Sequence, residues 1–204
     1  MFSATTPSLD LGRVQLYTIE ASGGRRVFLA RHPAKLPVFA DAVPSPNRKL
    51  VAFVGSHRGG QVDLFVMRPN GMGVRALTNT MAVEANPSWF PDGRSIAVTV
   101  VAETGISSQI AVVEVNGGSE RIVAQGGALK PQFSPDGRTL LYVGELVGNS
   151  PTGIHVVPAS GGASRLVAHG NSPSWSHDSR RIAFVDAVGR LSILNVGTGA
   201  VEKR

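Results

Sequence analysis

The sequence predicts an all-β fold built from a repeated four-stranded antiparallel unit. One turn recurs along the 204 residues, at Pro46-Asn47, Pro91-Asp92, Pro135-Asp136 and His177-Asp178, with spacings of 45, 44 and 42 residues. The same succession of short apolar runs surrounds each copy of the turn. The chain also holds 24 glycines and 13 prolines, well above average usage, which indicates many turns between short elements. A period of about 40 to 45 residues is typical of β-propeller blades.

The recurring turn joins the first two strands of each unit. In "SWFPDGRSIAV", proline fixes φ, the aspartate binds nearby backbone and glycine accepts a left-handed conformation. Five residues are therefore predicted to be structural turn residues: Asp92, Gly93, Asp136, Gly137 and Asp178. The first strand carries Trp89, Phe133 or Trp175, and we expect the two tryptophans to be buried between units.

Third strands are predicted over residues 62–68, 108–115, 152–158 and 189–196, each followed by a glycine-rich turn. Fourth strands begin near Arg75, Arg121 and Arg165, where we expect charge to protect an exposed edge from unwanted pairing. One such sheet cannot bury both of its faces, so copies must stack around a central axis.

The repeat thus predicts a β-propeller of about four full blades plus a half blade, in a single domain over residues 1–204. The half blade covers residues 10–37, and the full blades cover 38–80, 81–126, 127–170 and 171–204.

The units "PSWFPDGRSIAV", "PQFSPDGRTLLYV" and "PSWSHDSRRIAFV" closely resemble the WD-like propeller repeats of the TolB C-terminal domain. They are also similar to the propeller repeats of prolyl-oligopeptidase and tricorn-type peptidases. A TolB-like ring implies six blades, so the chain resembles an incomplete ring. It is a fragment, a small propeller closed by its own termini, or a ring completed in an oligomer. An unclosed ring exposes edges and a blade face, which favours self-association.

Charge and hydropathy exclude several partners. The net charge is +6, but the arginines are scattered singly without an aromatic platform, so no nucleic-acid partner is expected. No stretch approaches the roughly 18 apolar residues of a membrane span, so no membrane insertion is expected. The N-terminal residues contain no basic region followed by an apolar run, so the chain carries no recognisable signal peptide.

Motifs for catalysis are absent from the sequence. It contains no G-x-S-x-G, no H-E-x-x-H, no phosphate-binding loop and no dinucleotide fingerprint, so we expect no enzyme activity, no catalytic residues and no cofactor. The five histidines lie in different units without metal-ligand spacing, so no metal is expected. Because His32 and His169 follow equivalent strands and could face one rim, a metal-dependent lyase propeller stays an alternative.

Loops on a rigid scaffold often carry binding residues. One equivalent position, in the link to each innermost strand, holds a different polar residue in each unit: Asp41, Asn86, Lys130 and Ser172, with Glu84 nearby. We predict that these five residues bind a partner at the channel mouth.

The predicted function is a non-catalytic protein–protein interaction scaffold. Resemblance to TolB implies a periplasmic role in the Tol-Pal system, with a peptidoglycan-associated lipoprotein or TolA as partner. The alternative is the propeller portion of a larger, prolyl-oligopeptidase-like peptidase, in which the blades gate substrate access.

Overall fold

The structure, a computed structural model, describes residues 2–4, 15–18, 27–30, 38–56, 61–105, 107–117, 119–144 and 152–203. Every regular element within these ranges is a β-strand, and all strand pairs are antiparallel. The prediction of an all-β fold is therefore confirmed for the described residues. Most of the predicted half blade at residues 10–37 lies outside them.

Three sheets precede the C-terminal part of the chain. A three-stranded sheet contains β1 (Phe2–Ala4), β2 (Gln15–Thr18) and β3 (Val27–Ala30). The first four-stranded sheet, called the first sheet below, contains β4 (Val38–Pro44), β5 (Val51–Ser56), β6 (Val62–Met67) and β7 (Arg75–Ala76). The next four-stranded sheet, called the second sheet below, contains β8 (Val83–Trp89), β9 (Ser95–Val101), β10 (Ser108–Glu114) and β11 (Glu120–Ala124).

The C-terminal strands form one continuous ladder of seven. These strands are β12 (Ala128–Phe133), β13 (Thr139–Gly144), β14 (Gly153–Pro158), β15 (Arg165–Trp175), β16 (Arg181–Asp186), β17 (Leu191–Asn195) and β18 (Val201–Lys203). The long strand β15 pairs with β14 through residues 165–169 and with β16 through residues 170–175. We call β12–β14 with residues 165–169 the third sheet, and residues 170–175 with β16–β18 the fourth sheet.

The sequence predicts two separate strands, one beginning near Arg165 and one carrying Trp175, where the structure has the single strand β15. The chain continues through Gly170, whose φ is 155°. A Cβ atom there would lie 2.2 Å from the carbonyl oxygen of Val185, so only glycine fits between the two ladders.

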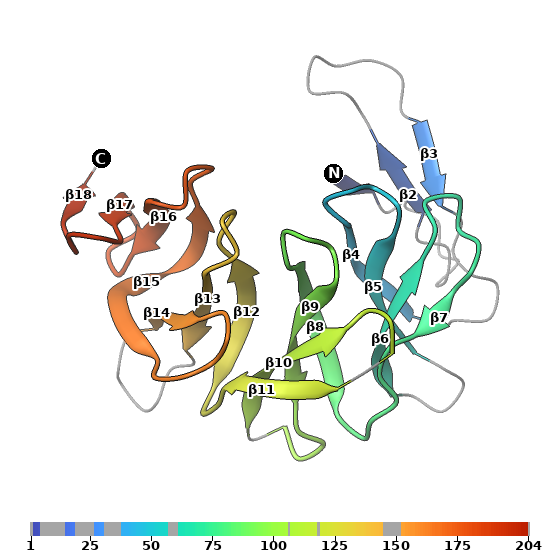
Figure 1. The fold of residues 1–204 in the computed structure, drawn as a ribbon. Coiled ribbons are helices and arrows are strands. Elements are labelled where there is room, and N and C mark those ends of the chain that lie inside the picture. Colours follow the sequence, from blue (N-terminus) through green and yellow to red (C-terminus); the bar gives the residue numbers. More distant parts are fainter. Residues whose placement is uncertain are drawn as a thin grey trace.

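The sheets follow one another along an arc, from β4–β7 on the right to β16–β18 on the left (Figure 1). No strand pairing within the described ranges closes this arc into a ring. The observed third strands begin within two residues of their predicted positions. The division of the chain into a half blade and four full blades stays a prediction.

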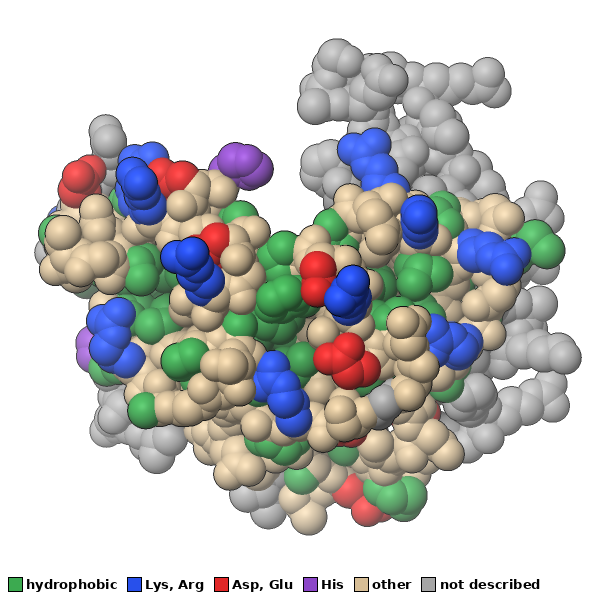
Figure 2. Space-filling view, viewed as in Figure 1, with side chains coloured by type: hydrophobic (Ala, Val, Ile, Leu, Met, Phe, Trp, Pro, Cys, Tyr) green, Lys and Arg blue, Asp and Glu red, His purple; other side chains and the backbone are tan. Residues whose placement is uncertain are grey.

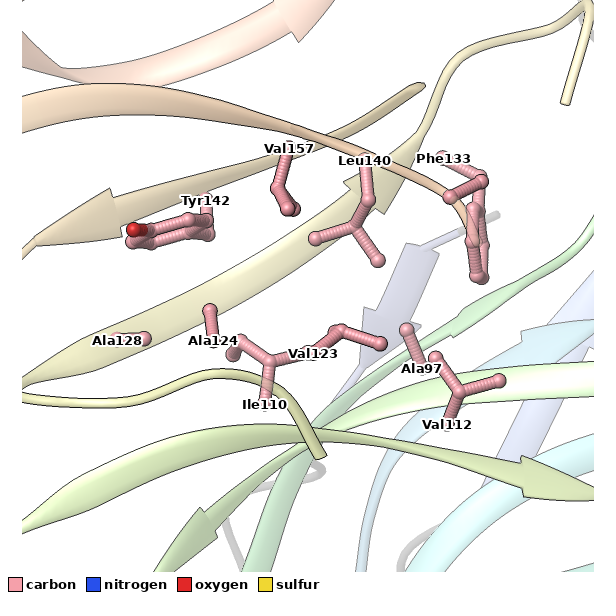
Figure 3. Close-up of a cluster of buried hydrophobic side chains, with 11 residues drawn as sticks. Ala97, Ile110, Val112, Val123, Ala124, Ala128, Phe133, Leu140, Tyr142 and Val157 are labelled. Atoms are coloured by element: carbon pink, nitrogen blue, oxygen red, sulfur yellow. The ribbon is translucent and has the colours of Figure 1, made fainter. Parts of the chain in front are cut away.

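The core lies between neighbouring sheets. Figure 3 shows side chains of the second sheet, including Ile110 and Val112, facing Phe133, Leu140 and Tyr142 of the third sheet. Burial of such apolar surface stabilises the fold by roughly 25 cal/mol per Å². Trp89 is buried between the first and second sheets, as expected, whereas Trp175 is only half-buried.

Two of the repeated arginines connect adjacent sheets. Arg75 Nη2 donates a hydrogen bond of 2.7 Å to the carbonyl oxygen of Val115, and Arg121 Nη2 donates one of 2.6 Å to that of Ala159. Their predicted role as edge charges is therefore incomplete, because both side chains bind the neighbouring sheet. The Arg165 side chain makes no hydrogen bond or ion pair with the described part of the chain.

Candidate partner-binding site

The innermost strand of each four-stranded sheet contains a bulge. The register shifts between Ala40 and Val43 in β4, and shifts recur at the same place in β8, β12 and β15. One residue at each bulge has a left-handed backbone, with φ between 50° and 53°: Asp41, Asn86, Lys130 and Ser172. These four predicted binding residues therefore lie within strands rather than in loops. A bulge of this kind re-aims the side chain that it carries.

The neighbouring sheet holds each of three bulges in place. Asp41 Oδ2 accepts hydrogen bonds from the main-chain nitrogen of Asn86 at 2.9 Å and from Asn86 Nδ2 at 3.2 Å. The main-chain nitrogen of Lys130 donates to Thr99 Oγ1 at 3.0 Å. Beside Ser172, the carbonyl oxygen of Pro173 accepts a hydrogen bond from Gln132 Nε2. These contacts hold the backbone at the three bulges, and for Asp41 and Asn86 they also hold the side chains.

A groove of about 510 Å³ crosses the inner strands β4, β8 and β12. Its lining comprises Val43, Pro44, Asn86, Pro87, Ser88, Trp89, Lys130, Pro131 and Gln132. The groove thus brings Asn86 and Lys130 together, and the hydrogen bond to Asn86 places Asp41 beside them. Ser172 is not one of the lining residues.

The surface combines apolar and charged groups. Figure 2 shows exposed apolar side chains among separate Lys, Arg, Asp and Glu side chains, without one continuous patch of either charge. The face in this view therefore shows no continuous basic patch of the kind that binds a polyanion.

Glu84 differs from the other predicted binding residues, because its side chain is only 1% exposed. Thr80 Oγ1 donates a hydrogen bond of 2.8 Å to Glu84 Oε1, while Oε2 is buried with no hydrogen-bond partner among the described residues. The pKa of Glu84 is raised to about 7, mainly by burial of the carboxyl group; the Thr80 hydrogen bond lowers it, and the negative charges of Asp63 and Glu120 raise it. The carboxylate is therefore not available to a partner in this conformation.

Sequence reasoning misplaced Glu84 because a glutamate near a strand end is usually solvated. The matching positions two residues before the bulge hold Ala128 and Gly170, which are both buried. The small residues in these two copies indicate an interior position, although the first copy holds Phe39 there.

The predicted turn aspartates accept local hydrogen bonds. Asp136 Oδ1 accepts from Ser134 Oγ at 2.6 Å and from the main-chain nitrogen of Arg138 at 3.0 Å. These two hydrogen bonds hold the pKa of Asp136 below its usual value. Asp178 accepts from Ser176 and from the nitrogen of Arg180 in the same way, and its pKa is also lowered. Asp92 Oδ1 accepts from the nitrogen of Arg94 at 2.8 Å.

The turn glycines are left-handed, with φ values of 73° at Gly93 and 71° at Gly137. A Cβ atom on Gly137 would lie 2.9 Å from Phe90 of the preceding sheet. The turn therefore requires glycine both for its backbone and for its contact with a neighbour.

The histidines in the described ranges do not gather at a metal site. His155 stacks on Tyr142 with ring centroids 5.0 Å apart, and burial, followed by the nearby charge of His169, lowers its pKa. The described residues contain no group of three or more histidine, cysteine, aspartate or glutamate side chains placed to hold a metal ion. His32 and His57 lie outside those residues. No helix in the described ranges is long and apolar enough to cross a membrane.

Comparison with solved structures identifies the same fold in proteins of low sequence identity. A putative TolB from Agrobacterium tumefaciens matches with a TM-score of 0.75 and 19% identity, over 95% of this chain and 73% of that chain. A puromycin-hydrolyzing peptidase from Mycobacterium tuberculosis matches with a TM-score of 0.70 and 16% identity, over 99% of this chain and 37% of that chain. At these identities the likeness shows the fold alone.

Sequence comparisons add a relative and a family. The uncharacterized peptidase YuxL of Bacillus subtilis (strain 168) is 36% identical over 63 residues, which cover 31% of this chain and 10% of the peptidase. The family model described as the TolB beta propeller domain matches residues 12–196. That match covers more than half of the sequence, and the propeller-like sheets and the TolB structural match agree with it. The chain belongs to the TolB beta propeller domain family.

Proposed function

We propose that this chain is a non-catalytic binding module, which holds a protein or peptide partner in the groove across β4, β8 and β12. The observation that carries the proposal is the recurrence of one bulge with different side chains. Asp41, Asn86 and Lys130 share a left-handed backbone position but offer an anion, an amide and a cation. A repeated backbone with varied polar groups is the arrangement expected of a recognition surface on a rigid scaffold.

The groove combines apolar and polar elements that suit a peptide. Trp89, Pro87 and Pro131 form a largely buried apolar floor, and the more accessible Lys130 and Asn86 supply hydrogen-bond donors. Apolar surface surrounded by polar groups is typical of protein interfaces. Since Lys130 is exposed, the chemistry favours a partner segment with a carboxylate that can reach this ammonium group.

Similarity to TolB supports a more specific proposal. The partner would be a peptidoglycan-associated lipoprotein or TolA, and the compartment would be the periplasm. This assignment rests on the resemblance and on family membership.

Titration calorimetry with the purified soluble domains of these two proteins tests both the identity of the partner and the role of the groove. We expect saturable binding that Lys130→Asp weakens about tenfold or more. Aspartate tolerates the left-handed backbone, so the variant changes the charge without removing the bulge. The matched control is Lys49→Asp, on an exposed turn residue outside the groove. Equal weakening in both variants would show that net charge, rather than the groove, governs binding.

A second function is favoured by the matches to peptidases. In this alternative the chain is the propeller portion of a larger peptidase, and the groove guides peptides toward a catalytic domain. It predicts a reading frame that encodes a hydrolase domain with G-x-S-x-G. It also predicts that Lys130→Asp in the full-length enzyme raises KM for long peptides but not for dipeptide substrates. Binding of a Tol-system partner without such a domain would favour the scaffold.

A further inference from the structure

The fourth sheet has an uncovered apolar face, formed by β16 and β17. We call it the open face and define it by Ala183, Val185, Leu191 and Ile193. Ala183 pairs with Ile193, and Val185 pairs with Leu191. Leu191 is 53% exposed, and the other three side chains are half-buried.

The first sheet carries nearly the same face in a covered form. Ala52 pairs with Val66, and Val54 pairs with Leu64, in the same register. All four side chains are at most 4% exposed. Ala52, Leu64 and Val66 lie in a buried cluster with Trp89 and Ile96 of the second sheet. The two faces differ only by Val66 in one and Ile193 in the other.

The matching positions of the second and third sheets are also buried, with at most 7% exposure. The open face is therefore an inter-sheet surface whose neighbour is not part of the described structure.

A pocket of about 250 Å³ lies on the open face, lined by Ser174, Trp175, Ser176, Arg181, Ala183 and Ile193. We call it the socket. In the first sheet the corresponding place holds the Trp89 side chain, which packs against Val43, Leu50 and Ala52. Ser174 pairs with Ala183 as Val43 pairs with Ala52. The carbonyl oxygen of Ser174 thus corresponds to that of Val43, which accepts a hydrogen bond of 2.9 Å from Trp89 Nε1.

We propose that the open face is a docking site for a further propeller sheet that carries a tryptophan on its inner strand. The indole ring fills the socket and donates its N–H to the carbonyl oxygen of Ser174. The remaining apolar surface of that sheet covers Val185 and Leu191, as the second sheet covers Val54 and Leu64.

A second copy of this chain fits the site less well. On the other face of its first sheet, Val51, Phe53, Phe65 and Met67 are at most 1% exposed, so that face is not available for docking. Two open faces brought together would place socket against socket, with no indole ring to fill either. The site therefore requires a sheet of the same repeat with a free tryptophan-bearing face.

The test is a fusion in which a second copy of residues 77–124 follows Lys203. This segment contains the link, Trp89 and the second sheet, which already covers the equivalent face of the first sheet. We expect a Tm about 4 °C or more above that of the 204-residue chain, and weaker binding of an apolar dye. Trp89→Ala in the appended copy alone is the matched control and should remove most of the gain.

Two results would overturn the proposal. The first is a fusion whose Tm and dye binding equal those of the parent chain, or do not depend on the appended tryptophan. The second concerns the parent chain itself, measured by light scattering. Leu191→Asp changes an exposed side chain and should leave the mass of the parent chain unchanged. A dimer that dissociates in this variant would show that a second copy covers the face.

Discussion

The indole Nε1 of Trp89 lies 2.9 Å from the carbonyl oxygen of Val43, a residue of the preceding sheet 46 positions earlier in the chain. The ring is 7% exposed and packs with Ala52 and Leu64 of that sheet. Trp175 Nε1 makes the corresponding hydrogen bond to Gln132 at 3.3 Å. One side chain thus combines apolar burial with a directional bond between sheets, which fixes how neighbouring sheets dock.

Trp89→Ala is expected to destabilise the protein by about 3 to 5 kcal/mol, because it removes a buried ring and leaves a cavity. Trp175→Ala should cost clearly less, since Trp175 is only half-buried and its hydrogen bond is longer. Urea unfolding of both variants measures the difference. Equal losses of unfolding free energy in the two variants would contradict the difference in burial between Trp89 and Trp175.

The left-handed backbone of Lys130 predicts an unusual order of stability among variants at this position. Lys130→Val should destabilise by about 1 to 2 kcal/mol, because a β-branched residue is strained at a φ of 52°. Lys130→Gly should be neutral or slightly stabilising at the same position. Lys49→Val serves as the control, since Lys49 is exposed and does not have a positive φ. Thermal melts in which Lys130→Val and Lys49→Val behave alike would argue against the bulge.

Arg121→Met is expected to lower stability by about 1.5 to 3 kcal/mol, the range for hydrogen bonds of charged groups. The variant keeps an extended apolar side chain but loses the bond to the carbonyl oxygen of Ala159. Arg165→Met is the matched control, because Arg165 starts the equivalent strand without such a contact. If chemical denaturation gives the same loss for both, the arginines contribute through charge and not through this bond.

The raised pKa of Glu84 predicts that the stability of the protein depends on pH. Its folded-state pKa of about 7 lies above the ordinary value of 4.5, so the folded protein binds this proton more tightly than the unfolded chain. The associated stabilisation is fully present below pH 4.5 and is lost as pH rises through 7. Glu84→Gln should therefore be more stable than the parent at pH 8, by about 1 to 3 kcal/mol.

The measurement for Glu84 is the difference in unfolding free energy between parent and variant at pH 4.5 and pH 8. Because other carboxyl groups titrate in both proteins, their contributions cancel in this difference. A difference that does not change with pH would mean that Glu84 is solvated in the folded state.

The strands and turns could be predicted because each copy of the repeat carries the same local signals. The Pro-Asp-Gly turns and the runs around Ile96 and Leu140 specify hairpins without reference to distant residues. The bulges could not be predicted, because a left-handed lysine or serine has no distinctive sequence signal.

The burial of Glu84 and the bonds of Arg75 and Arg121 depend on how sheets meet, which a single unit does not encode. The bulge position is recognisable in the sequence by its varied polar residues, which do not reveal its left-handed backbone.

The bulges on the inner strands also restrict how any partner can bind. An extended peptide usually joins a sheet edge by continuing its ladder of main-chain hydrogen bonds. In β8, β12 and β15 a left-handed residue interrupts that edge, and the following Pro87, Pro131 and Pro173 have no N–H to donate. Strand addition is therefore blocked at these three inner strands. A ligand at these strands must be recognised by side chains rather than by main-chain pairing. The same interruption protects these edges from amyloid-like stacking between molecules.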